Sequence, residues 1–419
     1  MLVTSVPCLS VIDACHRYLE MTVSKDKREF VVVMRSSAVA RFSKDAPPMI
    51  LRDFPTPAGA VQLTYRTIHR DDGLGVLLPR ELWIEARGPA PSLDDAITAY
   101  RNAANSLGVI IALSANAVIQ PAIVHIAFDN SSGKSEREYY VASIEEERGI
   151  PCPGRLVDVS ATFGLLQAVF NHHDSPRFHR AIAQYAHAIS FWSPGLELLA
   201  VAYLFMSVDA LTKLVLEDQL GVHGLSSNNQ LAAYLGVDIR QLDAEVRRRF
   251  ILENDVILAN EFSDISNAFE HGYGAVPDLI QRSVLIRDRV AHLVRSALIR
   301  SAKLDGDIES ELLARRWAEP KSISPYTVVL RGKLIGESQE LADPDSEYPL
   351  VVWKPRISNA VESEPRRVTM KLEGEITVTS LASGVSFLPT DVEIYGPGNA
   401  RDLNHVDAKD VADDSNDIM

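Results

Sequence analysis

The sequence has little cysteine and no hydrophobic run long enough to cross a membrane. It contains three cysteines in 419 residues, and Cys8, Cys15 and Cys152 are too few for a disulfide framework and lack the spacing of a zinc site. A reducing, cytoplasmic compartment is therefore expected. The most apolar segment, residues 198–208, is shorter than the roughly 20 residues that span a bilayer. It predicts a buried helix and no membrane partner.

Several motifs of common enzymes are also missing. The sequence contains no phosphate-binding P-loop, no Gly-x-Ser-x-Gly nucleophile turn and no His-Glu-x-x-His zinc motif. Four histidines, His172, His173, His179 and His187, gather in one region, but their spacing does not place a ligand pair on one helical face. We therefore expect no metal and no cofactor. Charged residues within the first twenty positions also argue against a secretory signal peptide.

The composition is that of a globular protein of two or three domains. Hydrophobic residues make up 46% of the chain and charged residues 23%, enough to bury a large core. The net charge of −14 argues against non-specific nucleic-acid binding by the whole molecule, although a local basic site remains compatible with it.

Patterning predicts the α+β class. The N-terminal region, residues 1–150, is expected to be β-rich, with strands at 30–34, 61–69, 75–78, 121–129 and 135–142. Ser92 is a predicted N-cap for one helix in this region. Apolar residues at helical spacing then predict an all-helical bundle over residues 151–319, with helices at 161–171, 176–191, 195–220, 229–235, 240–252, 255–271, 277–303 and 307–317.

Strand patterns return after the bundle. The segment 320–400 is expected to be small and β-rich, with strands at 326–331, 349–353, 367–372 and 375–379, the last two joined by a tight hairpin at 371–375. Residues 401–419 are expected to form a disordered acidic tail, because residues 402–419 hold six aspartates and one lysine.

Two helical segments carry the polar residues that could support chemistry. The run 204–213, Leu-Phe-Met-Ser-Val-Asp-Ala-Leu-Thr-Lys, places Asp209 inside an apolar helix, where we expect it to be buried against a polar partner. A second helix ends in a polar motif that includes Asn267, Glu270 and His271, followed by Gly272. The helix after it is rich in arginine.

This succession of helices resembles the HEPN superfamily, most closely its ApeA-like branch from bacterial antiphage defence, over about residues 180–303. In that superfamily an Arg, four to six arbitrary residues and a His form a metal-independent ribonuclease site, usually across a dimer. His271 and Gly272 match this motif, and Asn267 matches the polar residue that often follows the Arg. The Arg position itself is Ser266, which cannot supply a fixed positive charge to a phosphate.

The resemblance implies a set of site residues. His271 and Arg289 are the candidate catalytic pair, and Asn267, Glu270, Arg282, Arg287 and His292 are the candidate binding residues. Arg287 and His292 also have the motif spacing, but five helical steps separate them by roughly 140°. Arg289 is the better neighbour of His292, because residues three apart share a helical face.

Two functions from different classes remain open. In the first, the chain binds RNA, or cleaves it weakly without a metal, as a homodimer formed through the bundle. In the second, the bundle is a catalytically inactive dimerisation or interaction module. The serine at position 266 favours the second, and the basic helix that follows His271 favours the first.

Overall fold

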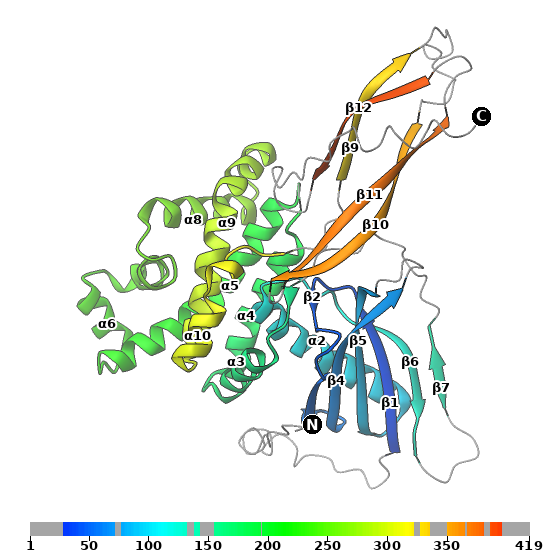
Figure 1. Ribbon diagram of the computed structural model, residues 1–419. Helices are drawn as coiled ribbons and strands as arrows, with labels where there is room; N and C mark the ends of the chain where they lie inside the picture. The colour runs from blue at the N-terminus through cyan, green and yellow to red at the C-terminus, as the bar shows by residue number, and fades with distance from the viewer. Residues whose placement is uncertain are drawn as a thin grey trace, which may run out of the picture. The chain divides into compact units, whose positions relative to one another are not determined.

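The structure is a computed structural model that describes residues 28–71, 77–131, 138–142, 155–193, 195–321, 327–335, 350–364, 367–380 and 386–395. The chain divides into two compact units (Figure 1). The first comprises Met1–His69, Pro79–Glu146 and Gly154–Ile323, and the second comprises Arg70–Leu78, Glu147–Pro153 and Ser324–Met419. The predicted acidic tail, residues 401–419, lies outside the described residues.

The first unit begins with a six-stranded sheet in the order β3-β4-β5-β1-β6-β7. Its strands are β1 Arg28–Ser36, β3 Met49–Thr56, β4 Gly59–Asp71, β5 Leu77–Ala90, β6 Ile123–Asp129 and β7 Tyr139–Val141. Short β2, Ala40–Arg41, pairs in parallel with β8, Arg155–Leu156. The predicted strands at 30–34, 61–69 and 121–129 are confirmed, whereas those at 75–78 and 135–142 lie partly outside the described residues. β6 and β7 pair antiparallel, as expected for a hairpin.

Helix α2, Leu93–Ala115, packs against one face of this sheet. Its predicted N-cap is confirmed, since the Ser92 side chain accepts a hydrogen bond from the Asp95 main-chain N–H at 3.1 Å. The hydroxyl of Tyr65, fully buried on β4, donates to the Ala104 carbonyl of α2 at 2.8 Å. The sheet and α2 therefore share one dry interface.

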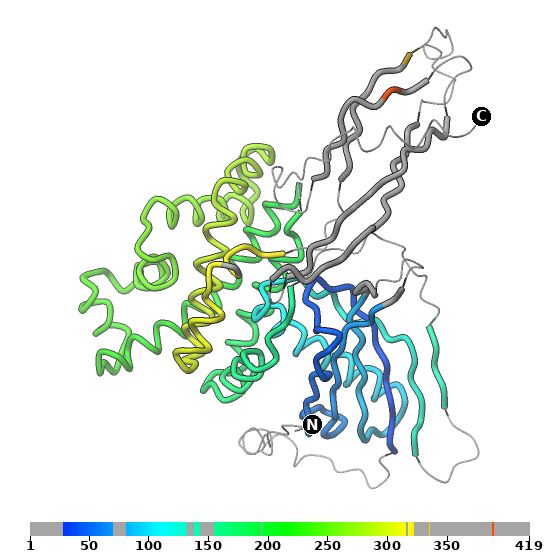
Figure 2. The backbone as a smooth tube through the Cα atoms, in the orientation of Figure 1, coloured from blue at the N-terminus to red at the C-terminus, as the bar shows by residue number. Residues whose placement is uncertain are grey.

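Helices occupy each of the predicted segments (Figure 2), but those predicted at 240–252 and 307–317 are each divided into shorter pieces. They are α3 Val159–Asn171, α4 Ser175–Ser190, α5 Glu197–Val222, α6 Asn228–Leu235, α7 Leu242–Val246, α8 Val256–Glu270, α9 Val276–Ser301 and α10 Gly306–Leu312. Two 3₁₀ turns, η1 Ile239–Gln241 and η3 Arg315–Trp317, and one π-helical turn, η2 Arg247–Ile251, complete the series. Residues 195–303, all of them described, contain no strand, so the all-helical prediction is confirmed over this range. Strand β8, Arg155–Leu156, lies inside the predicted bounds of 151–319 and is an exception.

The second unit contains four long strands. They are β9 Thr327–Ile335, β10 Leu350–Glu364, β11 Arg367–Ser380 and β12 Ser386–Tyr395. β10 pairs antiparallel with β11, and β12 with β9. The predicted tight hairpin at 371–375 is wrong, because Gly374 lies inside β11 opposite Pro355. Glycine is common in turns, but it also occurs inside strands where another backbone comes close.

Helix α5 is the central helix of the first unit. It is longer than the predicted apolar segment, and its most apolar 18 residues have a mean hydropathy of 1.8, enough by length and composition to cross a membrane. However, 61% of that window is buried inside the protein, where α5 packs on α4, α8 and α9. This is the burial of a core helix.

One buried core runs from the sheet into the helices. It includes Phe30 of β1, Tyr100 of α2, Phe178 of α4, Leu211 of α5 and Val290 of α9. The core therefore continues across residue 150, where we expected a domain boundary. The sheet and the helices form one packing unit.

A polar cluster at the C-terminal end of α2 lies within this core. Arg295 of α9 is 3% exposed and donates to the carbonyls of Leu113 and Ser114 at 3.1 and 3.0 Å, and to that of Leu312 at 2.7 Å. Arg155 of β8 donates to the Asn116 carbonyl at 3.0 Å. Burial lowers the pKa of both guanidiniums to about 10, so both stay charged at neutral pH.

Asn116 extends this cluster to two further segments. It ends α2 with a left-handed backbone, φ 45°, as asparagine often does. Its side-chain carbonyl accepts from the Tyr185 hydroxyl of α4 at 2.6 Å, and its amide donates to the Trp317 carbonyl at 2.6 Å. We call Asn116, Arg155, Tyr185 and Arg295 the α2 hub.

Arg295→Met should destabilise the protein by about 3–5 kcal/mol, because it takes a charged donor away from the buried carbonyls of Ser114 and Leu312. Arg300→Met is the matched control on the same helix. Arg300 is exposed and pairs with Glu253 at 3.3 Å, so its loss should cost less than about 1 kcal/mol. Urea denaturation measures both values, and equal losses would show that the hub does not hold the fold together.

Candidate functional site

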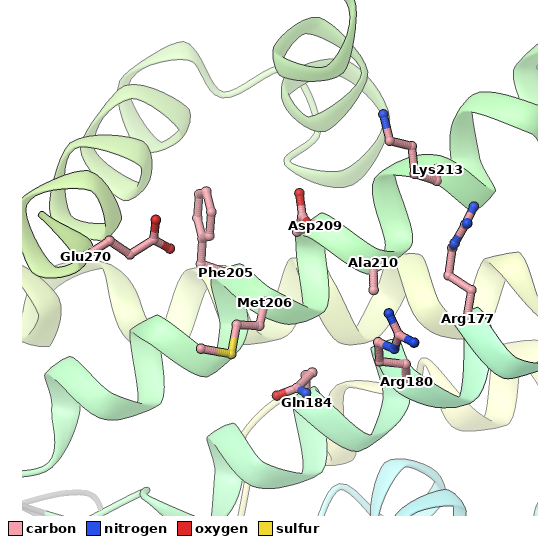
Figure 3. A pocket seen from close by; sticks show the side chains of 9 residues that line it. All are labelled: Arg177, Arg180, Gln184, Phe205, Met206, Asp209, Ala210, Lys213 and Glu270. Atoms are coloured by element: carbon pink, nitrogen blue, oxygen red, sulfur yellow. The ribbon is translucent and has the colours of Figure 1, made fainter.

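The structure gathers several of the predicted polar residues around one surface hollow of about 460 Å³ (Figure 3). Helix α5 contributes Asp209 and Lys213, which belong to the apolar-helix motif, and α8 contributes Glu270. The remaining lining residues are Arg177, Arg180 and Gln184 of α4 and Phe205, Met206 and Ala210 of α5. Residues sixty positions apart in the sequence thus meet at one place.

Helix geometry explains why α4 presents these side chains. The Asp174 side chain caps α4 by accepting from the Arg177 main-chain N–H at 3.2 Å, and Pro176 stands in its first turn. Positions 177, 180 and 184 then fall on one face, while the opposite face is buried. The sequence analysis missed these residues, although a strongly amphipathic helix with two arginines on its polar face was the available signal.

Close packing of α4 on α5 sets the shape of the hollow. The Ser207 hydroxyl of α5 donates to the Ala181 carbonyl of α4 at 2.8 Å, and both residues are buried. Met206 and Ala210 lie beside this contact on the lining face. The small side chain at Ala210 leaves the space between the two helices open.

The cations of the hollow differ in how they are neutralised. Lys213 pairs with Asp243 at 2.6 Å, and Arg177 lies 3.3 Å from Asp174 and 3.8 Å from Glu217. Arg180 is exposed and has no ion-pair or hydrogen-bond partner among the residues that the structure describes. Arg180 is therefore the guanidinium most available to an anion.

The π-helical turn η2 supports the α5 side of the hollow. Its first residue, Arg247, lies 5.2 Å above the Phe205 ring, donates to the Thr212 hydroxyl at 3.1 Å and pairs with Asp209 at 2.5 Å. Single π turns are frequent at functional sites. The sequence predicted one uninterrupted helix here, because a π turn leaves no mark in hydrophobic spacing.

Asp209 is placed differently from the expectation. We expected a buried carboxylate, but the side chain is 65% exposed, so that part of the prediction is wrong. The expected bond to a neighbouring helical segment exists, through Arg247. The wide apolar surface of α5 covers most of its circumference, yet Asp209 occupies the narrow strip that faces the hollow.

His271 follows the last residue of α8 and is exposed. Its main-chain N–H donates to the Asn267 carbonyl at 3.0 Å, and its ring is parallel to that of Tyr273 at 6.3 Å. Gly272 has φ +67°, so the chain turns here as expected. Ser266, at the motif's Arg position, is 2% exposed and faces the core.

The arginines of α9 are engaged away from His271. Arg282 makes two hydrogen bonds to Glu261 at 2.6 and 3.0 Å, and Arg287 is buried with its guanidinium 4.3 Å from the Trp192 ring. Arg289 lies thirteen residues into α9, about 20 Å from the start of that helix by its rise. The structure therefore does not bring Arg289 to His271 within one chain.

Arg289 and His292 form a separate group. Arg289 is 53% exposed and lies 3.8 Å from Glu253. Burial, followed by the charge of Arg289, lowers the pKa of His292, so His292 is neutral at neutral pH. As expected from the spacing, His292 is near Arg289, and Arg287 points elsewhere.

The four histidines between positions 172 and 187 do not converge. His173 pairs with Glu217 at 2.7 Å, the His172 Nδ1 accepts from the Asp174 main-chain N–H at 3.2 Å, and His179 contacts the Ser106 carbonyl at 3.0 Å. Within the described ranges, no three His, Cys, Asp or Glu side chains are placed to hold a metal ion.

Comparison with known proteins gives no match: no protein-family model, no curated protein and no solved structure matches the chain. We therefore infer the function from the residues of this chain alone.

Asp209→Ala should lower the free energy of unfolding by less than about 1 kcal/mol, because the carboxylate is exposed. Arg247→Met should cost more, about 1–2 kcal/mol, since it also removes the bond to Thr212 and the contact with Phe205. Chemical denaturation of both variants measures the difference. A larger loss for Asp209→Ala would mean that the carboxylate is the structural partner of the pair.

Proposed function

We propose that this chain is an RNA-binding protein of the HEPN kind, and that the hollow between α4, α5 and α8 is where it contacts RNA. One observation carries the proposal. Asp209 and Lys213, from the motif on α5, and Glu270, adjacent to His271, line the same hollow as Arg177 and Arg180. Glu270, one of the candidate binding residues, thus shares a surface hollow with two residues of the α5 motif and two arginines of α4.

The charge pattern supports local recognition of phosphate. A guanidinium binds phosphate oxygens through two parallel hydrogen bonds, and Arg180 is free to do so. Lys213 of α5 and Arg177 of α4 supply further positive charge to the same end of the hollow. Because the net charge of the chain is −14, RNA would be repelled from most of the surface and held only where cations gather.

Cleavage would require a cation beside His271. A general base at His271 needs a neighbouring cation to stabilise the charge that develops on phosphate. The α9 arginines described above have other partners in the chain, so an arginine from a second subunit would have to complete the site. We expect tight binding to be separable from cleavage, and cleavage to be slow.

A second candidate is the inactive interaction module. Its supporting observation is the apolar surface around His271, where Phe269 is 39% exposed, Tyr273 56% and Val276 58%. Exposed apolar groups of this kind are typical of protein–protein interfaces. Homodimer formation through this surface would serve either candidate.

Arg180→Glu should weaken binding of a fluorescent single-stranded RNA by about tenfold or more at low salt, because it reverses the charge of the available guanidinium. Arg101→Glu, an exposed arginine on α2, makes the same change in net charge and should alter binding by less than about twofold. Fluorescence anisotropy at two salt concentrations measures both.

Cleavage of the same RNA is followed with His271→Ala and Arg289→Ala. Loss of cleavage in His271→Ala with unchanged binding would place catalysis at His271. If none of the variants at Arg180, His271 and Arg289 changes binding or cleavage, RNA is not the ligand of this site and the interaction module takes its place.

A further inference from the structure

The hollow has two chemically different ends. α4 and α5 pack antiparallel, so Arg177 and Arg180 lie beside Lys213 at one end, and Gln184 lies beside Met206 toward the other (Figure 3). Met206 and Lys213 are seven positions apart, which corresponds to about 10 Å along α5. A ligand that fits must therefore be anionic at one end and less polar at the other.

The cationic end suits one phosphate group. Within the part of the chain that the structure describes, the Arg180 guanidinium has no partner and the Lys213 ammonium pairs only with the half-exposed Asp243. Exposed ion pairs of this sort are weak and exchange readily. An incoming phosphate can thus take hydrogen bonds from both side chains without disturbing a buried group.

The other end suits a planar ring. Met206 is 45% exposed on the surface of α5, and Phe205 lines the hollow next to it. Thioether and aromatic side chains provide favourable contacts for the faces of nucleobases. The Phe205 ring is held by Phe262 and Arg247 at centroid distances of 5.5 and 5.2 Å.

Two acceptors lie at this end, the side-chain oxygen of Gln184 and the carboxylate of Glu270. The side-chain oxygen of Gln184 is buried and has no hydrogen-bond partner within the described residues. Among the described residues, the Glu270 carboxylate accepts only a long 3.3 Å hydrogen bond from Ser266, so its oxygens can accept further bonds. An unpaired buried acceptor is costly, and an N–H donor on a ligand would remove that cost.

We infer that the hollow takes a single nucleotide unit, with its phosphate between Arg180 and Lys213 and an amino-bearing base between Met206 and Gln184. The inference rests on the proposed RNA function and adds a direction and a base preference to it. Adenine and cytosine carry an exocyclic amino donor, whereas uracil and hypoxanthine carry a carbonyl at the same position. A carbonyl there would face the acceptors of Gln184 and Glu270 and be rejected.

The test is isothermal titration of the full chain with two matched pairs of ribonucleoside monophosphates, CMP against UMP and AMP against IMP, with adenosine and inorganic phosphate as single-end probes. CMP and AMP should bind about tenfold more tightly than their partners. Adenosine and phosphate should each bind at least tenfold more weakly than AMP. Gln184→Leu, whose folding is checked by its melting temperature, should reduce both preferences to within about twofold.

Two results would overturn the inference. Equal binding within both pairs would show that no acceptor reads the base, and binding of phosphate as tight as that of AMP would show that the hollow holds only an anion. In either case, RNA binding that is still lost in Arg180→Glu would leave the proposed function in place. RNA binding that is indifferent to Arg180→Glu would remove the proposed function together with the inference.

Discussion

The guanidiniums of Arg155 and Arg295 are buried in the core without a carboxylate partner among the hydrogen bonds they make. They donate instead to main-chain carbonyls at the C-terminal end of α2. Those carbonyls belong to the last turn and the C-cap of α2, and they carry the negative end of its dipole. Burying two cations in this way costs desolvation energy, which well-placed hydrogen bonds to the carbonyls must offset. The arrangement stabilises the fold only if α2, β8 and α9 keep their positions relative to one another.

The hub in turn sets where the hollow forms. Tyr185 of α4 bonds to Asn116 in the hub, and Gln184, the next residue, lines the hollow. Rotation of α4 is therefore limited by a buried hydrogen bond on one face, which fixes the direction of the polar side chains on the other. Arg295 anchors α9, against which α5 packs. A site formed by side chains on rigid helices is held more precisely than one formed by loops.

Much of the fold could be predicted because it follows from local chemistry. Ser92 caps the start of α2 and Gly272 ends α8 with a left-handed turn, because each residue type has a strong backbone preference. The strand at Gly374 was misjudged because glycine serves in both turns and strands. Asp209 was misjudged because its burial depends on which strip of α5 its neighbours leave uncovered.

The candidate site was predicted only in part, for a physical reason. The motif residues Asp209, Glu270 and His271 were recognised from their sequence neighbours. Arg177, Arg180 and Gln184 were not, because only the packing of α4 on α5 brings them to the hollow. Pairing of arginines is likewise invisible in sequence, and it is what separates the free Arg180 from the engaged Arg282 and Arg287.

RNA binding in the hollow between α4, α5 and α8 can be tested by photochemical cross-linking of single-stranded RNA to the full chain, followed by mass spectrometry of the peptides. If RNA binds in the hollow, cross-links should fall within residues 177–184 and 205–213, the two segments that form its walls. These cross-links should be lost in Arg180→Glu. Efficient cross-links confined to the six-stranded sheet or to residues 327–395, unchanged in Arg180→Glu, would contradict RNA binding in the hollow.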